Sequence, residues 1–158
     1  MFRYLLRVLC ILLITTTFAW GNIEKTHAQE QTLAPLINEI CEKYEVEVNL
    51  VKAIIRVESR YVATAVSKDK TPCRGLMQLS SPTAKKYGVC NVFDPAENIE
   101  GGVRYLSDLK KMFNNNMTKV IAAYNTGEAN VIRLGIQPKV KKYVDLVLVF
   151  KKKYDNRN

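Results

Sequence analysis

Apolar residues recur every three or four positions through most of this chain, which is the period of an amphipathic helix. The first such stripe consists of Leu33, Leu36, Ile37, Ile40, Cys41 and Tyr44. The last consists of Val140, Tyr143, Val144, Val147 and Leu148. No segment is predicted with confidence as a strand, so the pattern predicts a compact, single-domain, all-α fold.

Capping and breaking residues divide the stripes into separate helices. Asn49 is expected to cap a helix over 50–60, and a polar stretch over 64–74 is too long for a tight turn. Further helices are predicted to begin at Ser81-Pro82, Asp94-Pro95, Thr118 and Glu128, and the breaks between them fall at Gly88, 114–116, Gly127 and Gly135.

The N-terminal 28 residues have the layout of a secretory signal. Arg3 and Arg7 flank the start of an apolar run over 5–20, which is short and weak for a membrane span. Small residues that follow fit cleavage after either Gly21 or Ala28. The sequence therefore predicts a signal peptide over 1–28 and an exported domain over 29–158. An uncleaved signal anchor, which would tether the domain to the membrane, is the alternative.

Charge and composition narrow the chemistry of the exported domain. Cleavage after Ala28 removes three basic residues and one acidic residue, which lowers the net charge from +9 to +7. A basic surface suits an anionic polymer or membrane, or it is ordinary surface lysine. The same cleavage removes His27 and Trp20, the only histidine and the only tryptophan. Ser-His and Cys-His catalysis and a histidine-bound zinc are thereby excluded.

Glu58 is the anomaly in the predicted helix over 50–60. On a helical wheel it falls within the apolar arc formed by Leu50, Val51, Ile54 and Val57. A carboxyl group on that face is desolvated, which raises its pKa and keeps it protonated near neutral pH. Such a group suits a general acid for glycoside cleavage, although a buried glutamate paired with an arginine has the same pattern.

Four short motifs follow in a specific order along the chain. They are Glu58-Ser59, Gly75-Leu-Met-Gln-Leu79, Asn98-Ile-Glu-Gly-Gly102 with Tyr105-Leu106, and Ala123-Tyr-Asn125 with Gly127, before a final Tyr143-Val144. In this order and spacing, from about Leu33 to Tyr154, the chain resembles the soluble lytic transglycosylase (SLT) domain family. The resemblance implies a goose-lysozyme-like helical fold and a periplasmic enzyme that cleaves peptidoglycan.

The resemblance also implies roles for individual residues. Glu58 matches the catalytic acid/base, and Tyr124 matches the tyrosine that hydrogen-bonds its carboxylate. The implied substrate contacts are Ser67, Gly75, Met77, Gln78 and Asn125, with Met77 and tyrosines against the sugar faces. The chain departs from the family in the longer spacing from Ser67 to Gly75, and in Lys139 and Val140 where the family has Glu-Thr.

The mechanism implied by the family needs one carboxyl group and neither metal nor cofactor. Glu58 protonates the oxygen between N-acetylmuramic acid and N-acetylglucosamine, and then accepts the proton of the muramoyl C6 hydroxyl as a 1,6-anhydro ring closes. Small members of this family often assist type III or type IV secretion or pilus assembly, so such a system is a possible partner of this expected monomer.

Two other readings stay open beside this one. A hydrolytic lysozyme needs a second carboxylate to activate water, and Asp69 is the candidate, although a solvated loop position between Lys68 and Lys70 is favoured for it. A non-catalytic glycan-binding or scaffold module of an envelope-spanning system is the other. A function in nucleic acid binding is suggested only by the net charge, and the predicted export of the domain argues against it.

Cysteine placement predicts one disulfide. Cys41 lies on the apolar stripe of its helix, where a thiol packs as a small hydrophobic group. Cys73 and Cys90 flank the Gly75–Leu79 segment and would close a loop of about 17 residues, worth about 3 kcal/mol in the chain-entropy model. In an oxidising compartment we therefore expect Cys73 to pair with Cys90.

Overall fold

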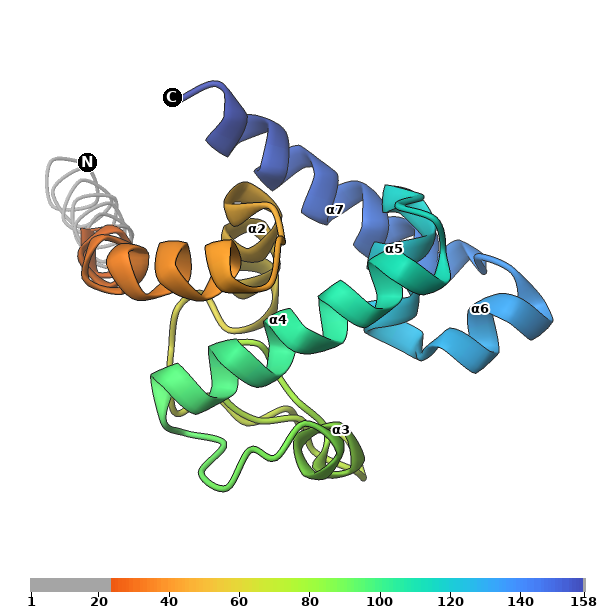
Figure 1. Cartoon of the computed structure of the whole chain (residues 1–158), viewed down its shortest axis with the longest axis horizontal. Coiled ribbons are helices and arrows are strands. Elements are labelled where there is room, and N and C mark those ends of the chain that lie inside the picture. The colour runs from red at the N-terminus through yellow and green to blue at the C-terminus, as the bar shows by residue number, and fades with distance from the viewer. Residues whose placement is uncertain (1–23, 158) are drawn as a thin grey trace, which may run out of the picture. The chain divides into compact units, whose positions relative to one another are not determined.

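The expected helices are present in the structure, a computed structural model that describes residues 24–157. The chain divides into two units, 1–34 and 35–158, and the described part of the first, 24–34, is helical. In the second unit, residues 35–43 are helical, and six labelled helices follow (Figure 1). They are α2 (Val48–Glu58), α3 (Ser81–Lys86), α4 (Pro95–Met112), α5 (Met117–Thr126), α6 (Glu128–Leu134) and α7 (Pro138–Asp155). Residues 1–23, which include most of the predicted signal segment, lie outside the described residues.

Side-chain caps begin α3, α4 and α5. Ser80, Asp94 and Asn116 each accept a hydrogen bond from a backbone N–H in the first turn of the helix that follows. The predicted cap of α2 is wrong by two residues, because α2 begins at Val48 after Glu47. Asn49 lies inside α2, and its side-chain amide donates to Asp155 of α7 at 2.9 Å. The side chain that was expected to cap α2 thus joins α2 to α7 instead.

The core of the second unit forms where α2 packs against α7 and α5 packs against α4, α6 and α7. Ile54 and Leu50 of α2 and Val147 of α7 have no solvent-exposed surface. Burial of such aliphatic side chains stabilises the fold by about 2 kcal/mol each. The all-α prediction is confirmed, since no strand forms within the part of the chain that the structure describes. Of the described helices, none combines the length and the apolarity needed to cross a membrane.

The segment between α2 and α3 has no helix, and one buried side chain holds it in place. Two isolated antiparallel bridges join Arg74 to Val66 and to Leu79. Asn98, fully buried in α4, accepts a hydrogen bond from the Met77 backbone N–H at 2.8 Å and donates to the carbonyls of Arg74 and Val92. Because all three bonds come from one amide, the Gly75–Leu79 segment is fixed against α4.

Gly75 is required by this arrangement. Its φ is +81°, and a Cβ atom there would lie 2.2 Å from both Asn98 Nδ2 and the Val92 carbonyl oxygen. Gly88 has a similar φ of +73°, but a Cβ atom there would have open space around it. The two glycines share a positive φ and differ in the space around them.

We predict that Gly75→Ala lowers the free energy of unfolding by about 3 kcal/mol or more, since left-handed strain adds to overpacking. Gly88→Ala, the matched control, carries the strain alone and loses about 1 kcal/mol. Urea unfolding of both variants measures this difference. Equal losses would contradict the argument that Asn98 and Val92 crowd Gly75.

Candidate functional site

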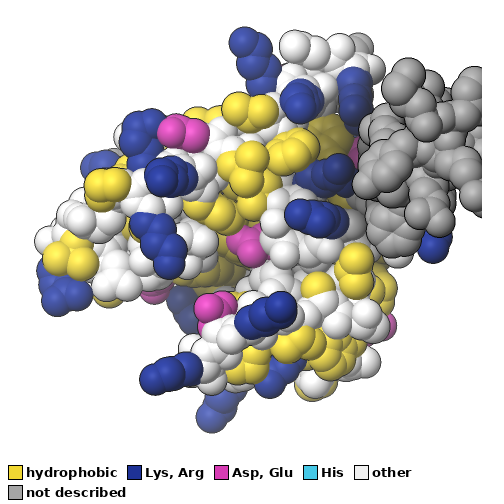
Figure 2. Space-filling model, turned by 180° about the vertical axis from the view of Figure 1, so that it is seen from behind, with side chains coloured by type: hydrophobic (Ala, Val, Ile, Leu, Met, Phe, Trp, Pro, Cys, Tyr) yellow, Lys and Arg dark blue, Asp and Glu magenta, His cyan; other side chains and the backbone are white. Residues whose placement is uncertain are grey.

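A cleft of about 400 Å³ brings together five of the seven candidate site residues, which are Glu58, Ser67, Gln78, Tyr124 and Asn125. Its walls come from the end of α2, the 67–80 segment, the start of α3, the middle of α4 and the α5–α6 junction. Figure 2 shows a hollow in one face of the molecule, with an acidic side chain at its inner end and Lys and Arg side chains around it. The lining residues are Glu58, Ser67, Asp69, Cys73, Gln78, Leu79, Ser80, Thr83, Tyr105, Tyr124, Asn125, Thr126 and Gly127.

Glu58 is the last residue of α2 and carries the most perturbed carboxyl group of the cleft. Burial raises its pKa from 4.5 to about 7, and the hydroxyl of Tyr143, which donates to Glu58 Oε1 at 2.5 Å, opposes that rise. The carboxyl end of a helix also disfavours negative charge. Near neutral pH the protonated and ionised forms of Glu58 are therefore both populated, as a group that donates and then accepts a proton requires.

The tyrosine that contacts Glu58 is Tyr143, and the role expected for Tyr124 is wrong in this respect. The Tyr124 hydroxyl donates instead to the Met77 backbone oxygen at 2.7 Å. Tyr124 is the eighth residue of α5, whereas Tyr143 projects from α7, the helix that packs along α2. The sequence placed Tyr143 on the apolar stripe of its helix and in the final Tyr-Val motif, but gave it no role.

Tyr124 still belongs to the cleft, because its ring forms one wall with Tyr105. The ring centroids of these two tyrosines are 5.5 Å apart, and Tyr87 continues the stack at 5.7 Å from Tyr105. The Tyr105 hydroxyl donates to Glu128 Oε2 at 2.9 Å. Each ring is thus held by its hydroxyl and by its neighbour, and the rings form a fixed aromatic surface.

Only part of the Gly75–Leu79 segment faces the cleft. Gln78 lines it, with φ +49°, and its side-chain nitrogen donates to the carbonyls of Ala65 and Gly75, which leaves the side-chain oxygen for a ligand. Met77 is fully buried, and its sulfur packs where a Cβ atom of Gly102 would be only 2.4 Å away. The expected contact of the Met77 side chain with sugar is therefore wrong. Gly75 is likewise buried behind the wall.

Three other candidate residues lie on the cleft wall. Ser67 accepts a hydrogen bond from the Cys73 backbone N–H at 3.0 Å, which fixes the lengthened loop despite its unusual spacing. Asn125 lies at the end of α5 and is exposed. Asp69 is exposed as expected of a solvated loop residue, yet it also lines the cleft with Glu58. The structure thus brings a second carboxylate to the same cavity.

Comparison with known proteins decides the family. The model of the transglycosylase SLT domain matches residues 35–146, most of the chain. This chain belongs to the transglycosylase SLT domain family. The resemblance inferred from the four motifs is confirmed.

Similar full-length proteins are named membrane-bound lytic murein transglycosylase F. The SLT chain is 31% identical over 125 residues to the protein of that name from Desulfosudis oleivorans, which covers 73% of this chain and 27% of that protein. It is 36% identical over 99 residues to the protein from Hahella chejuensis, covering 59% and 19%. It is 33% identical over 110 residues to the protein from Klebsiella pneumoniae, covering 65% and 21%. The chain therefore spans between 19% and 27% of the length of these curated relatives.

A solved structure supports the lysozyme-like helical fold of the SLT domain. The X-ray structure of an inactive mutant of lytic transglycosylase Slt from Pseudomonas aeruginosa superposes with a TM-score of 0.67. The sequence identity is 24%, and the match covers 78% of this chain and 24% of that one. At this sequence identity, the structural similarity supports a shared fold and does not extend to function.

The predicted disulfide of the SLT domain is not formed, since Cys73 and Cys90 are both free. The Cys73 side chain faces the cleft, where Glu58 and Asp69 add to burial in raising the pKa of its thiol. Cys90 is exposed after α3, with its thiol near the Gly88 carbonyl. Cys90 is not among the residues that line the cleft. Cys41 is a buried free thiol as expected, and burial raises its pKa to about 12.

The described part of this domain contains no cluster of side chains that could serve as metal ligands. Among residues 24–157, His, Cys, Asp and Glu side chains form no group of three or more that could hold an ion.

We predict that Glu58→Gln stabilises the domain in a pH-dependent way. Because the folded-state pKa of Glu58 lies above its unfolded value, the folded protein binds more protons between about pH 4.5 and 7, and the free energy of unfolding falls as pH rises through that window. Glutamine abolishes this loss. The variant should match the wild type near pH 4 and exceed it by on the order of 3 kcal/mol near pH 8. Urea unfolding at both pH values measures the difference, and a gain independent of pH would contradict the assignment.

We predict that Tyr143→Phe raises the pKa of Glu58 further. The Tyr143 hydroxyl stabilises the ionised carboxylate, so its removal leaves the effect of burial unopposed. A carbon-13 NMR titration of the Glu58 carboxyl group measures the change without reference to activity. Tyr124→Phe is the matched control, because the Tyr124 hydroxyl donates to Met77 and its loss should leave the titration nearly unchanged. A larger shift in the control would reverse the two roles.

Proposed function

We propose that this SLT domain is a peptidoglycan lytic transglycosylase that cleaves the β-1,4 bond between N-acetylmuramic acid and N-acetylglucosamine. The observation that carries the proposal is Glu58, whose carboxyl group has a pKa of about 7 in a tyrosine-lined cleft. Membership of the family and the names of its relatives support the same reaction. A residue that is half protonated near neutral pH can serve as acid and then as base.

In the proposed mechanism Glu58 donates its proton to the glycosidic oxygen as the bond from that oxygen to muramoyl C1 breaks. The N-acetyl carbonyl of the substrate stabilises the positive charge at C1, in a substrate-assisted variant of glycoside cleavage. The ionised Glu58 then accepts the proton of the C6 hydroxyl, whose oxygen attacks C1 and closes the 1,6-anhydro ring. No water is consumed, and Glu58 ends protonated as it began.

Residues around Glu58 are proposed to hold the carboxyl group and the sugar. The Tyr143 hydroxyl orients the carboxyl group through its 2.5 Å hydrogen bond. Tyr105 and Tyr124 present their rings to the sugar, while Gln78 and Asn125 supply amide groups. Ser67 lies on the same wall and is proposed as a further polar contact. Proximity and orientation of this kind are worth several kcal/mol when the reacting atoms are aligned.

Hydrolysis by a lysozyme-type mechanism is the second candidate, because Asp69 lines the cleft with Glu58. An inverting hydrolase uses such a second carboxylate to activate water. Asp69 is an exposed residue of the 67–80 segment, whereas Glu58 is half-buried at the end of α2. This contrast in environment favours the reaction that needs only Glu58.

The proposed location follows from the substrate, whereas the proposed partners follow from the family resemblance. We infer that residues 1–28 direct export and that the domain acts in the periplasm, where peptidoglycan lies; the names of the relatives, which call them membrane-bound, are compatible with an anchored form. An accessory role in a type III or type IV secretion system or in pilus assembly, and a monomeric state, are proposals that rest on the resemblance alone.

Mass analysis of products from purified sacculi tests the proposed function. We expect muropeptides one water lighter than lysozyme products, with muramoyl ends that resist borohydride reduction. Glu58→Gln should lower the rate by about a hundredfold or more, because glutamine cannot transfer the proton. Asp69→Asn should leave the rate within about tenfold, since an exposed carboxylate contributes only indirect electrostatics.

The same digest identifies the alternatives. Reducing muramoyl ends as the main product, together with loss of activity in Asp69→Asn, would establish a hydrolase. Tight binding to sacculi with no release of fragments by the wild type would establish a non-catalytic glycan-binding module.

A further inference from the structure

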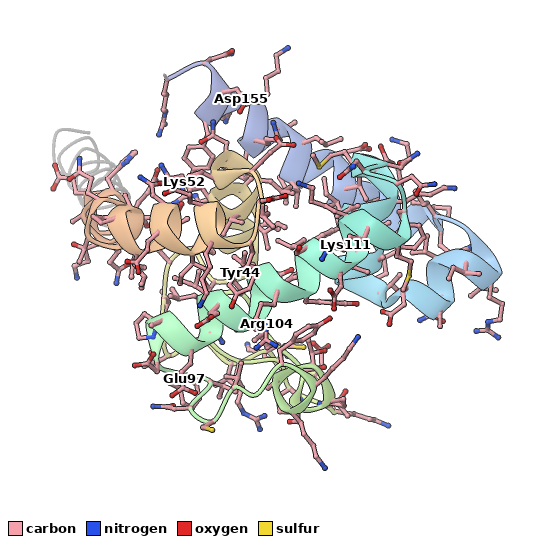
Figure 3. The ribbon with its side chains drawn as sticks, in the orientation of Figure 1. Tyr44, Lys52, Glu97, Arg104, Lys111 and Asp155 are labelled. Atoms are coloured by element: carbon pink, nitrogen blue, oxygen red, sulfur yellow. The ribbon has the colours of Figure 1, made fainter. Side chains whose placement is uncertain are left out.

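A second, smaller cavity lies on α4 away from the cleft. This outer pocket has a volume of about 180 Å³ and is lined by Tyr44, Tyr87, Arg104, Ser107, Asp108 and Lys111. Figure 3 labels Tyr44 beside α4, with Arg104 and Lys111 farther along the same helix. The outer pocket and the cleft share no lining residue.

Helix geometry separates the two cavities. Positions 104, 107, 108 and 111 fall on one side of α4, because residues three, four and seven apart share a helical face. Tyr105 lies about 100° further round the helix and lines the cleft instead. Tyr87 and Tyr105, from the two cavities, stack with their ring centroids 5.7 Å apart. A ligand in the outer pocket would therefore leave the cleft free while lying close to it.

Asp108, the one carboxylate that lines the outer pocket, and Glu100, which lies outside the lining, both accept hydrogen bonds from its tyrosines. Asp108 accepts a hydrogen bond from the Tyr87 hydroxyl at 2.8 Å. Glu100, one helical turn before Arg104, accepts from the Tyr44 hydroxyl at 2.5 Å and from Lys43 at 2.8 Å. These bonds fix the two tyrosine rings as walls of the pocket.

The two basic side chains of the outer pocket, Arg104 and Lys111, still have hydrogen-bond donors available to a ligand. The Arg104 guanidinium makes one hydrogen bond, to the Tyr87 backbone oxygen at 2.8 Å, and lies over the Tyr87 ring, so most of its five N–H donors are unused. Within residues 24–157, the Lys111 ammonium has neither a hydrogen bond nor an ion pair. The two cations outnumber Asp108, the single carboxylate of the lining, and two cations beside aromatic walls suit a further carboxylate.

The size of the outer pocket limits its occupant. A stable protein partner covers about 800 Å² on each side, far more than this cavity offers. A short, flexible acidic chain needs only one carboxylate and a few neighbouring atoms to fill it. The proposed substrate carries many such chains, since its muramoyl residues bear stem peptides with free carboxylates.

We propose that the outer pocket binds a carboxylate of a peptidoglycan stem peptide, and so anchors the enzyme to the wall while the cleft holds a glycan strand. This inference rests on the proposed function for its ligand. Because the polymer presents many stem peptides close together, even a weak second contact raises the overall affinity.

Titration with a synthetic stem tetrapeptide, L-alanyl-γ-D-glutamyl-diaminopimelyl-D-alanine, tests the inference by proton–nitrogen NMR. Amide signals around Arg104 and Lys111 should shift, and the peptide with amidated carboxyl groups should leave them unchanged. Lys111→Glu should weaken binding of the tetrapeptide by about fivefold or more. Lys119→Glu is the matched control, an exposed helical lysine on α5 outside the outer pocket, and should bind as the wild type does.

A second measurement separates the inference from the proposed function. Lys111→Glu should bind sacculi more weakly at low salt, yet cleave a short soluble glycan without stem peptides at the wild-type rate. Shifts confined to the cleft, equal binding of the amidated peptide or equal losses in both lysine variants would overturn the outer site. Failure of the wild type to cleave either substrate would overturn the proposed function, while the NMR titration would still judge the outer pocket.

Discussion

The cleft depends on the amide of Asn98, which is buried in α4 and joins three backbone groups of other segments. A buried amide left unpaired costs about 1–3 kcal/mol, so a partial displacement of the Gly75–Leu79 segment is disfavoured. The bonds also bring the backbone at Gly75 so close to Asn98 that a side chain has no room there. The position of Gln78 on the cleft wall follows from this fixed segment, as does that of the Met77 carbonyl, which Tyr124 uses.

Two opposing effects set the pKa of the Glu58 carboxyl group, and both arise from the way α2 packs in the fold. Burial disfavours the ionised carboxylate, whereas the Tyr143 hydroxyl donates to it. Burial is the larger influence, and the resulting pKa of about 7 lies where a group can both donate and accept a proton near neutral pH. The same burial costs stability when Glu58 ionises, so the site is less stable than an apolar one would be.

Tyrosine rings, and not Met77, form the apolar wall of the cleft, because Tyr105 and Tyr124 line it while Met77 is fully buried. Tyr87, Tyr105 and Tyr124 form a stack that reaches from the outer pocket to the cleft, and each hydroxyl is hydrogen-bonded. Because their polar ends are satisfied, the rings can lie against the core and still present apolar faces. One row of aromatic rings thus connects the cleft, which contains Glu58 and Asp69, to the outer pocket, which contains Arg104, Lys111 and Asp108.

The sequence by itself determined the helices, because the 3.6-residue period and the breaks at Gly88, 114–116, Gly127 and Gly135 are local properties of the chain. It also placed Glu58 on an apolar face, and the order of its motifs identified the family. Only the tertiary structure decided that Tyr143 of α7 reaches Glu58, 85 residues away, that Met77 is buried and that Cys73 and Cys90 are free thiols. Periodicity fixes the direction of a side chain relative to its own helix, whereas these contacts depend on how separate helices and loops pack against one another.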